Sequence, residues 1–329
     1  MPRALITGIR GQDGRYLAEF LHGKGYEVFG LVHDARTDDS RVARELPFVE
    51  LIRGNLTDIS SLVRAYEEAQ PAEVYNLGSQ SAVDLSFTEP RATLEVTGLG
   101  PVNFLEALRI SGAADSGVKF YQASSSEMYG NAGQLPYSEL TAFHPESPYA
   151  IAKVLAHHAV RMYRDAYGMF AATGICFNHE SPRRGLNFVT RKVSMAVARI
   201  SLGLQSKLAL GNLDARRDWG FAGDYVEAMW LTMQHEEPDD FVIATGESHS
   251  VTEFLELAFS RVGIENWRDY VVQDPRFFRP RDVLDLCGDN AKAQSVLDWK
   301  PTVTFEELVN LMVDADLKLI GEGSADTAR

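Results

Sequence analysis

Short apolar runs alternate with longer segments of mixed apolar and polar residues through the first half of the chain. Continuous apolar runs predict strands over residues 4–7, 27–32, 49–53, 73–77 and 118–123. Between them, apolar residues at helical spacing predict helices over residues 14–23, 58–69, 91–111 and 148–166. Apolar strands that alternate with helices form a parallel sheet, which helices cover on both faces. Residues 171–176 predict a sixth strand of this sheet.

The pattern becomes less regular after about residue 180. Helices are predicted over residues 188–202, 222–234, 252–262 and 305–319, and strands over 207–210 and 240–244. We therefore expect an α/β fold with a doubly wound parallel sheet in residues 1–180, to which some later segments return. Residues 181–320 are expected to form a smaller α/β lobe that completes a ligand pocket. Residues 321–329 are small and polar and predict a flexible tail.

Composition narrows the classes of protein. Of the 329 residues, 45% are hydrophobic, and no run of about 18 apolar residues predicts a membrane span. The N-terminus leads straight into the first strand, which leaves no room for a signal peptide. Cys176 and Cys287 are the only cysteines, so we expect a reducing cytoplasm and neither a disulfide framework nor a metal site.

The charges are unevenly distributed. The formal net charge of −14 argues against nucleic acid as a partner. Residues 182–217, however, carry eight Lys or Arg and a single acid, Asp214. This positive patch predicts a small anionic ligand, and a solvated helix face is the alternative.

A glycine turn follows the first strand. Gly8, Gly11 and Gly14 are each separated by two residues, and they open the helix predicted from residue 14. Glycines permit the tight turn, and bare backbone lets a pyrophosphate approach the helix N-terminus. The turn, with Gln12 and Asp13 inside it, predicts a Rossmann-type dinucleotide site.

The sequence after the second strand leaves the choice of dinucleotide open. An acid at this place accepts a hydrogen bond from the ribose of NAD, whereas Arg binds the 2′-phosphate of NADP. Both Asp34 and Arg36 occur here. Arg36 can reach a 2′-phosphate, and Asp34 can accept from a ribose hydroxyl or point to solvent.

Tyr149 and Lys153 are four residues apart at the start of a predicted helix, and Ser125 lies at the end of the preceding strand. Spacing of four places the phenol and the ammonium on one helix face. Ser125 would hydrogen-bond a substrate hydroxyl. Lys153 would hold the cofactor ribose and lower the pKa of Tyr149 from about 10 towards neutrality, so that Tyr149 acts as a base. A simple surface pair on a helix is the alternative.

Glu127 distinguishes the kind of reaction. Oxidation of an alcohol needs one base, which Tyr149 supplies. Two residues after Ser125 on an extended strand end, Glu127 would point to the same face. It could remove the proton beside a newly formed carbonyl, after which a neighbouring hydroxyl leaves as water. The alternative is that Glu127 caps the next turn.

Together these residues resemble the extended short-chain dehydrogenase/reductases and, within them, the GDP-mannose 4,6-dehydratase family. The resemblance covers nearly the whole chain. It includes the segments FNHESPRRG at 177–185, FVTRK at 188–192, GNLDARRDW at 211–219 and FFRP at 277–280. It implies a hydro-lyase that oxidises C4 of GDP-mannose with bound NADP⁺, removes the C5 proton through Glu127 with loss of the C6 hydroxyl, and returns the hydride to C6. It also implies a homo-oligomer, either dimer or tetramer.

The resemblance also implies further site residues. For the cofactor, NADP with NAD possible, these are Arg36, Asn55, Leu56, Leu77 and His179, in addition to the glycine turn, Tyr149 and Lys153. For the nucleotide sugar, they are Gln80, Ser81, Asn178, Lys192, Arg217, Arg279 and Asp282, in addition to Ser125 and Glu127. His179 could equally be a buried, hydrogen-bonded histidine.

The chain departs from the family at several of these positions. Ser125 replaces a usual Thr and keeps the hydroxyl. His33 and Asp34 replace a pair of arginines, Asn55 replaces Asp near the adenine, and Asp282 is one methylene shorter than the usual Glu. A nucleotide-sugar 4-reductase or epimerase of the same fold, or a dehydratase for another nucleotide hexose, stays open as an alternative. A reductase or epimerase would need Ser125, Tyr149 and Lys153 but not Glu127.

Overall fold

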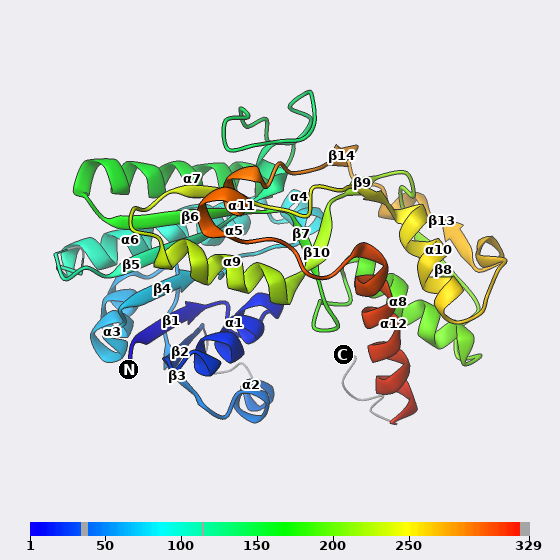
Figure 1. Ribbon diagram of the computed structural model, residues 1–329, viewed down its shortest axis with the longest axis horizontal. Coiled ribbons are helices and arrows are strands. Elements are labelled where there is room, and N and C mark those ends of the chain that lie inside the picture. The colour runs from blue at the N-terminus through cyan, green and yellow to red at the C-terminus, as the bar shows by residue number, and fades with distance from the viewer. Residues whose placement is uncertain (34–38, 114, 323–329) are drawn as a thin grey trace.

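A seven-stranded parallel sheet forms the centre of the molecule (Figure 1). The computed structural model describes residues 1–33, 39–113 and 115–322. The strand order is β11-β6-β5-β4-β1-β2-β3. The strands are β1 (Arg3–Thr7), β2 (Glu27–Val32), β3 (Val49–Arg53), β4 (Glu73–Asn76), β5 (Lys119–Ser125), β6 (Phe170–Cys176) and β11 (Asp240–Ile243). The order reverses between β1 and β4, and ligands of open α/β sheets bind at the carboxyl ends of the strands beside such a reversal.

Helices cover both faces of the sheet, as the apolar strands predict. One face packs on α3 (Ile59–Ala69), α6 (Gly100–Ile110) and α7 (Pro148–Tyr167) through buried side chains such as Leu62, Phe104 and Val160. The other face packs on α1 (Gln12–Gly23), α9 (Ala222–Gln234) and α11 (Ala291–Leu297), with Leu17 and Met229 in its core. The doubly wound α/β fold predicted from the sequence is confirmed.

The predicted helix over residues 91–111 is interrupted. The structure has α5 (Pro90–Thr93), a π-helical stretch at Leu94–Leu99, and then α6. Pro101 has no amide hydrogen, so it cannot donate the bond that a regular helix requires at that position. The predicted helix is therefore present over residues 90–110, with a change to π-helical hydrogen bonding in its middle. Shorter helices of this half are α2 (Ser40–Glu45) and α4 (Val83–Thr88).

The smaller part of the chain has its own core. α8 (Val189–Ser201), α10 (Val251–Arg261) and α12 (Phe305–Gly321) enclose buried side chains that include Phe254, Phe259 and Met312. Short strands complete it: β7 (Asn178–Glu180), β8 (Leu208–Leu210), β9 (Arg216–Arg217), β10 (Trp219–Phe221), β12 (His249–Ser250), β13 (Val271–Gln273) and β14 (Asp285–Leu286). In Figure 1 this lobe lies to the right of the sheet. Residues 323–329, most of the expected tail, lie outside the described residues.

Two late elements return to the sheet. α9 contacts α1, and β11 pairs in parallel with β6 as the seventh strand. Among the described residues, no helix is long and apolar enough to cross a membrane.

A buried charge network fixes β11 to its neighbours. Asp240 Oδ1 accepts hydrogen bonds from Arg164 Nη2 at 2.7 Å and from Thr173 Oγ1 at 2.8 Å. His157 is buried beside it, with 3.8 Å between His157 Nε2 and Asp240 Oδ2. Burial pushes the pKa of the Asp240 carboxyl upwards, but the charges of His157 and Arg164 and these hydrogen bonds bring it below its ordinary value. The ionised carboxylate therefore stabilises the fold.

Replacing Asp240 with Asn should lower the free energy of unfolding by about 2–3 kcal/mol at neutral pH, because Arg164 loses its charged partner. Since the pKa is lowered in the folded state, this stabilisation is present above the unfolded pKa of about 4 and is lost as the pH falls through the folded pKa. Urea unfolding at neutral and at acidic pH measures both effects. Asp314→Asn, which breaks an exposed pair with Arg261, is the control and should change stability by less than about 1 kcal/mol. A difference between wild type and Asp240→Asn that does not shrink in acid would contradict this account.

Candidate active site

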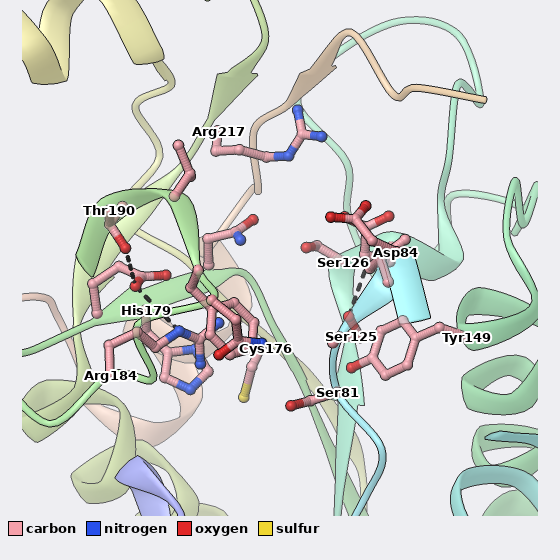
Figure 2. A pocket seen from close by; sticks show the side chains of 18 of the residues that line it. Ser81, Asp84, Ser125, Ser126, Tyr149, Cys176, His179, Arg184, Thr190 and Arg217 are labelled. Carbon is pink, nitrogen blue, oxygen red and sulfur yellow. Dashed lines mark hydrogen bonds and ion pairs between the residues drawn. The ribbon is translucent and has the colours of Figure 1, made fainter. Parts of the chain in front are cut away.

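A cavity of about 770 Å³ lies between the sheet and the smaller lobe. Its lining comes from the glycine turn, from the segments that follow β4, β5 and β6, and from α7 and α8. Figure 2 shows Ser125 and Tyr149 on one side of the cavity and His179 and Arg184 on the opposite side. The predicted edge of the sheet is therefore the wall of a single large cavity.

The glycine turn leaves no room for side chains. Gly8 has a φ of +73°, and a Cβ on Gly14 would lie 2.4 Å from the carbonyl oxygen of Gly8. Helix α1 begins at Gln12. The residue before it, Gly11, has no side chain that could cap the amides of the first helical turn. Uncapped amides at a helix N-terminus, approached over bare backbone, suit a pyrophosphate. The turn thus fits a dinucleotide.

An ion pair ties this turn to β7. His179 Nε2 lies 2.9 Å from Asp13 Oδ2, and His179 Nδ1 lies 2.7 Å from the carbonyl oxygen of Phe177. Burial acts to raise the pKa of Asp13, but the charge and hydrogen bond of His179 lower it to about 2. Burial acts to lower the pKa of His179, but Asp13 raises it above its ordinary value. Since protein groups occupy both nitrogens, His179 is a partly buried, hydrogen-bonded histidine that also lines the cavity.

The start of α7 places Tyr149 and Lys153. The Ser147 side chain caps the helix by accepting from the Ala150 amide, and Pro148 occupies the first turn. The Tyr149 side chain then faces the cavity on the same side as Ser125, at the end of β5. Lys153 Nζ donates to the carbonyl oxygen of Ala123 at 2.6 Å and lies 5.7 Å from the centre of the Tyr149 ring.

The pKa of Tyr149 is not lowered in this structure. Burial raises it well above 10, and the carboxylate of Glu127 adds to the increase, while Ser125 and Arg184 oppose it. Burial also lowers the pKa of Lys153, to about 8. The prediction that Lys153 lowers the pKa of Tyr149 towards neutrality was wrong for this structure, because the same burial disfavours both charged forms.

Glu127 faces the cavity for a different reason from the one predicted. β5 ends at Ser125, and Ser126–Met128 form a 3₁₀ turn instead of continuing the strand. Ser125 Oγ caps this turn by accepting from the Glu127 amide at 3.3 Å. The Glu127 carboxylate instead lies towards the cavity, with Oε1 3.8 Å from Arg279 Nη1. The extended geometry was wrong, but the turn still presents the carboxylate beside Ser125.

Cationic side chains surround the outer part of the cavity. Arg217 Nη2 lies 3.6 Å from Asp282 Oδ1, and Arg217 Nη1 donates to the carbonyl oxygen of Val283 at 2.9 Å. Lys192 lies 3.5 Å from the centre of the Phe277 ring. Burial lowers the pKa of both Lys192 and Arg217, so a ligand with negative charge would stabilise their protonated forms.

Comparisons with known proteins identify the family of this chain. The family model described as GDP-mannose 4,6 dehydratase matches residues 5–312. The chain belongs to the GDP-mannose 4,6-dehydratase family.

GDP-mannose 4,6 dehydratase 2 of Arabidopsis thaliana is 54% identical, covering 96% of this chain and 87% of that protein. The human GDP-mannose 4,6 dehydratase is 48% identical, covering 96% and 92%. Among solved structures, a UDP-glucose 4-epimerase of Thermus thermophilus in complex with NAD is 28% identical with a TM-score of 0.82, covering 95% of this chain and 98% of that chain.

GDP-mannose 4,6-dehydratases are hydro-lyases, and the fold is that of enzymes with a nicotinamide cofactor. Most residues that the sequence singles out line the cavity: Gly8, Gly11, Gln12, Asp13, Gly14, Leu77, Ser81, Ser125, Glu127, Tyr149, Lys153, Asn178, His179, Lys192, Arg217, Arg279 and Asp282. Asn178 has a buried Oδ1 that makes no hydrogen bond within the described part of the chain, which leaves an acceptor for a ligand.

Three predicted residues do not line this cavity, and a fourth lies outside the described residues. Asn55 Oδ1 accepts from the Thr57 amide, Leu56 packs near Gly100, and Gln80 hydrogen-bonds the backbone of Ala82. These contacts hold the loops behind the cavity wall. The fourth residue is Arg36.

The positive patch does not act as one surface. Arg184, Lys192 and Arg217 line the cavity, whereas Arg183 pairs with Glu19 and Arg191 with Asp316. Sequence reasoning missed Arg184 as a site residue, although the patch contained it. Its guanidinium lies 3.6 Å from the centre of the Phe188 ring and pairs with Glu180 at 3.2 Å, which fixes it on the side of the cavity opposite Tyr149.

Proposed function

We propose that this chain converts GDP-mannose into GDP-4-keto-6-deoxymannose and water, with an NADP that ends the cycle in its starting state. The observation that carries the proposal is a single cavity that holds Ser125, Tyr149 and Lys153 together with a second acid–base group, Glu127. The first three serve alcohol oxidation. A separate carboxylate beside them serves an elimination.

The cofactor would lie against Gly8, Gly11 and the uncapped start of α1, with Lys153 near its ribose. When bound, a nicotinamide ring supplies the redox chemistry, in which a hydride leaves C4 of the sugar and is later returned to C6. The uncapped amides and the nearby Arg184 provide the positive potential that a pyrophosphate needs.

Tyr149 takes the proton of the C4 hydroxyl while Ser125 holds that oxygen. As the base, Tyr149 reacts as its phenolate and ends this step as the neutral phenol, the form that burial favours. The positive charge of Arg184, which acts to lower the pKa of Tyr149, favours the phenolate before this transfer. Lys153 is held in place by the Ala123 carbonyl.

Glu127 removes the C5 proton, which the adjacent C4 carbonyl makes acidic. The electron pair of the C5–H bond forms the C5–C6 double bond, and the C6–O bond breaks. The C6 oxygen leaves as water with the proton that we assign Glu127 to remove from C5. The return of the hydride to C6 then requires a proton at C5, which balances the one that Tyr149 took from the C4 hydroxyl. The proposed roles of Tyr149 and Glu127 are thus separate: one acts on oxygen and the other on carbon.

The outer part of the cavity suits the nucleotide diphosphate. Arg217, Arg279 and Lys192 can pair with phosphate oxygens, and Asn178 offers a polar amide.

The direct test is incubation of the purified protein with GDP-mannose and a trace of NADP⁺, without any added reductant. We expect a 4-keto product and no accumulation of reduced cofactor, because the hydride is returned. Stoichiometric reduction of the cofactor, or interconversion of the C4 epimers without loss of water, would contradict the proposal and indicate the reductase or epimerase alternative. UDP-glucose and dTDP-glucose as parallel substrates test the alternative of another nucleotide hexose.

The preference for NADP is supported by two arginines at the carboxyl ends of β1 and β3. Arg10 Nε lies 2.7 Å from Asp39 Oδ1, and Arg53 Nη2 lies 2.8 Å from Asp39 Oδ2. Arginine at this edge of the sheet is suited to a 2′-phosphate.

Replacing Arg10 with Ala should therefore weaken NADP⁺ binding about tenfold, because a charged hydrogen bond to phosphate is lost, and should change NAD⁺ binding less than about twofold. Calorimetric titration with each dinucleotide measures this. Arg109→Ala, which breaks a surface pair with Glu106, is the charge-matched control. Equal losses for both dinucleotides would show that Arg10 does not contact the 2′-phosphate.

We also propose a homo-oligomer that works in the reducing cytoplasm. The outer face of α7 carries half-exposed apolar side chains, Ile151, Leu155 and Met162, at helical spacing, which suits a contact between copies. Both cysteines are free thiols.

A further inference from the structure

Arg279 is shared among three carboxylates. Its Nε lies 2.7 Å from Asp84 Oδ1, and its Nη1 lies 3.8 Å from Glu127 Oε1 and 4.0 Å from Asp282 Oδ1. Glu127 and Asp282 belong to the predicted site. Asp84 comes from α4, on the sheet side of the cavity, so its bond with Arg279 crosses between the two parts of the chain. Figure 2 shows Asp84 on the same side of the cavity as Ser125 and Ser126.

Asp84 is the most exposed of the three acids. Its side chain is 72% exposed, compared with 11% for Glu127 and 24% for Asp282. An exposed ion pair contributes about 0–1 kcal/mol, because water solvates both partners when they separate. The Asp84–Arg279 pair can therefore open at little cost, whereas Glu127 and Asp282 stay inside the cavity.

The local charge favours such an opening when an anion arrives. Arg217 and Arg279 already face Asp84, Glu127 and Asp282, so the negative charges outnumber the positive ones in this group. A diphosphate adds further negative charge, and like charges at close range repel. Removing Asp84 from Arg279 frees a guanidinium edge and reduces this repulsion.

We propose that Asp84 occupies the place on Arg279 that a phosphate oxygen of the nucleotide sugar takes on binding, and so acts as an internal competitor of the ligand. The inference rests on the proposed function for the class of ligand, a nucleoside diphosphate. Asp84 then weakens the binding of substrate and product alike and speeds their release, without touching the reacting carbons. Asp84 thus sets the affinity for the nucleoside diphosphate through its contact with Arg279.

The first experiment measures the affinity of GDP, a probe that does not react, by calorimetry. Asp84→Asn should bind GDP about two- to fivefold more tightly than wild type, which corresponds to the loss of a competing exposed ion pair. Asp314→Asn, which removes one negative charge from an exposed pair on α12, is the matched control and should leave GDP affinity unchanged.

Two further readouts separate competition from a merely structural role. In an Arg279→Gln background, the Asp84→Asn change should no longer tighten GDP binding. In turnover, Asp84→Asn should lower KM, with kcat equal or lower because product leaves more slowly. Equal or weaker GDP binding by Asp84→Asn would overturn the inference, since Asp84 would then orient Arg279 for the ligand. Wild type that fails to bind GDP would overturn the proposed function and this inference with it, whereas wild-type binding with no gain in Asp84→Asn overturns the inference alone.

Discussion

Replacing Glu127 with Gln is expected to lower the rate of 4-keto-6-deoxy product formation by about 10²- to 10⁴-fold, the usual contribution of a positioned general base. Gln keeps the size and polarity of the side chain but cannot accept the C5 proton. The structure suits the carboxylate to this task because it faces the cavity beside Ser125 and Arg279, while Ser125 and not Glu127 caps the turn. Product formation from GDP-mannose, followed by chromatography, measures the loss.

The same variant should still oxidise C4, because Tyr149, Ser125 and Lys153 are unchanged. Reduced nicotinamide should therefore accumulate on Glu127→Gln, which its absorbance reports, while wild type shows none at steady state. Glu306→Gln, an exposed acid in the first turn of α12, is the control for the loss of one charge. Full dehydratase activity in Glu127→Gln would rule out Glu127 as the carbon base and leave the proposed elimination without a proton acceptor.

Replacing Tyr149 with Phe is expected to lower kcat by a similar factor of about 10²–10⁴, but through a different step. The variant keeps the buried ring and loses only the hydroxyl on the Ser125 side of the cavity, so the fold should be retained. Because C4 oxidation comes first, neither product nor reduced cofactor should form. Single-turnover measurements with GDP-mannose, and near-ultraviolet circular dichroism as the check on folding, test this.

The absence of reduced cofactor in Tyr149→Phe, together with its presence in Glu127→Gln, would assign the two proton transfers to two residues. Tyr167→Phe is the matched control, because it removes the hydroxyl of an exposed tyrosine at the end of the same helix, and it should leave turnover unchanged. Retention of more than about a tenth of wild-type kcat by Tyr149→Phe would mean that another group takes the C4 hydroxyl proton.

The sequence by itself determined the framework of this protein. The strands predicted at residues 27–32 and 49–53 are β2 and β3 with the same bounds. β2 is buried along nearly its whole length, as an apolar run between two helical layers requires, whereas β3 at the sheet edge is partly exposed. The glycine turn was also readable, because a side chain at Gly14 would collide with the backbone of Gly8. Tyr149 and Lys153 are four residues apart, about one helical turn, so their position on one face of the helix was predictable. All these features depend on residues close together in the chain.

The tertiary structure alone decided the electrostatics of the site. Burial raises the pKa of Tyr149, although the local sequence suggested the opposite. Which cations of residues 182–217 face the cavity depends on distant partners, such as Glu19 for Arg183. The contact of Asp84 with Arg279 joins residues 195 positions apart. Solvent exclusion and charge pairing depend on distances in space, which no local pattern of residues encodes. The residues of the site could therefore be named from the sequence, whereas their protonation states and ion-pair partners could not.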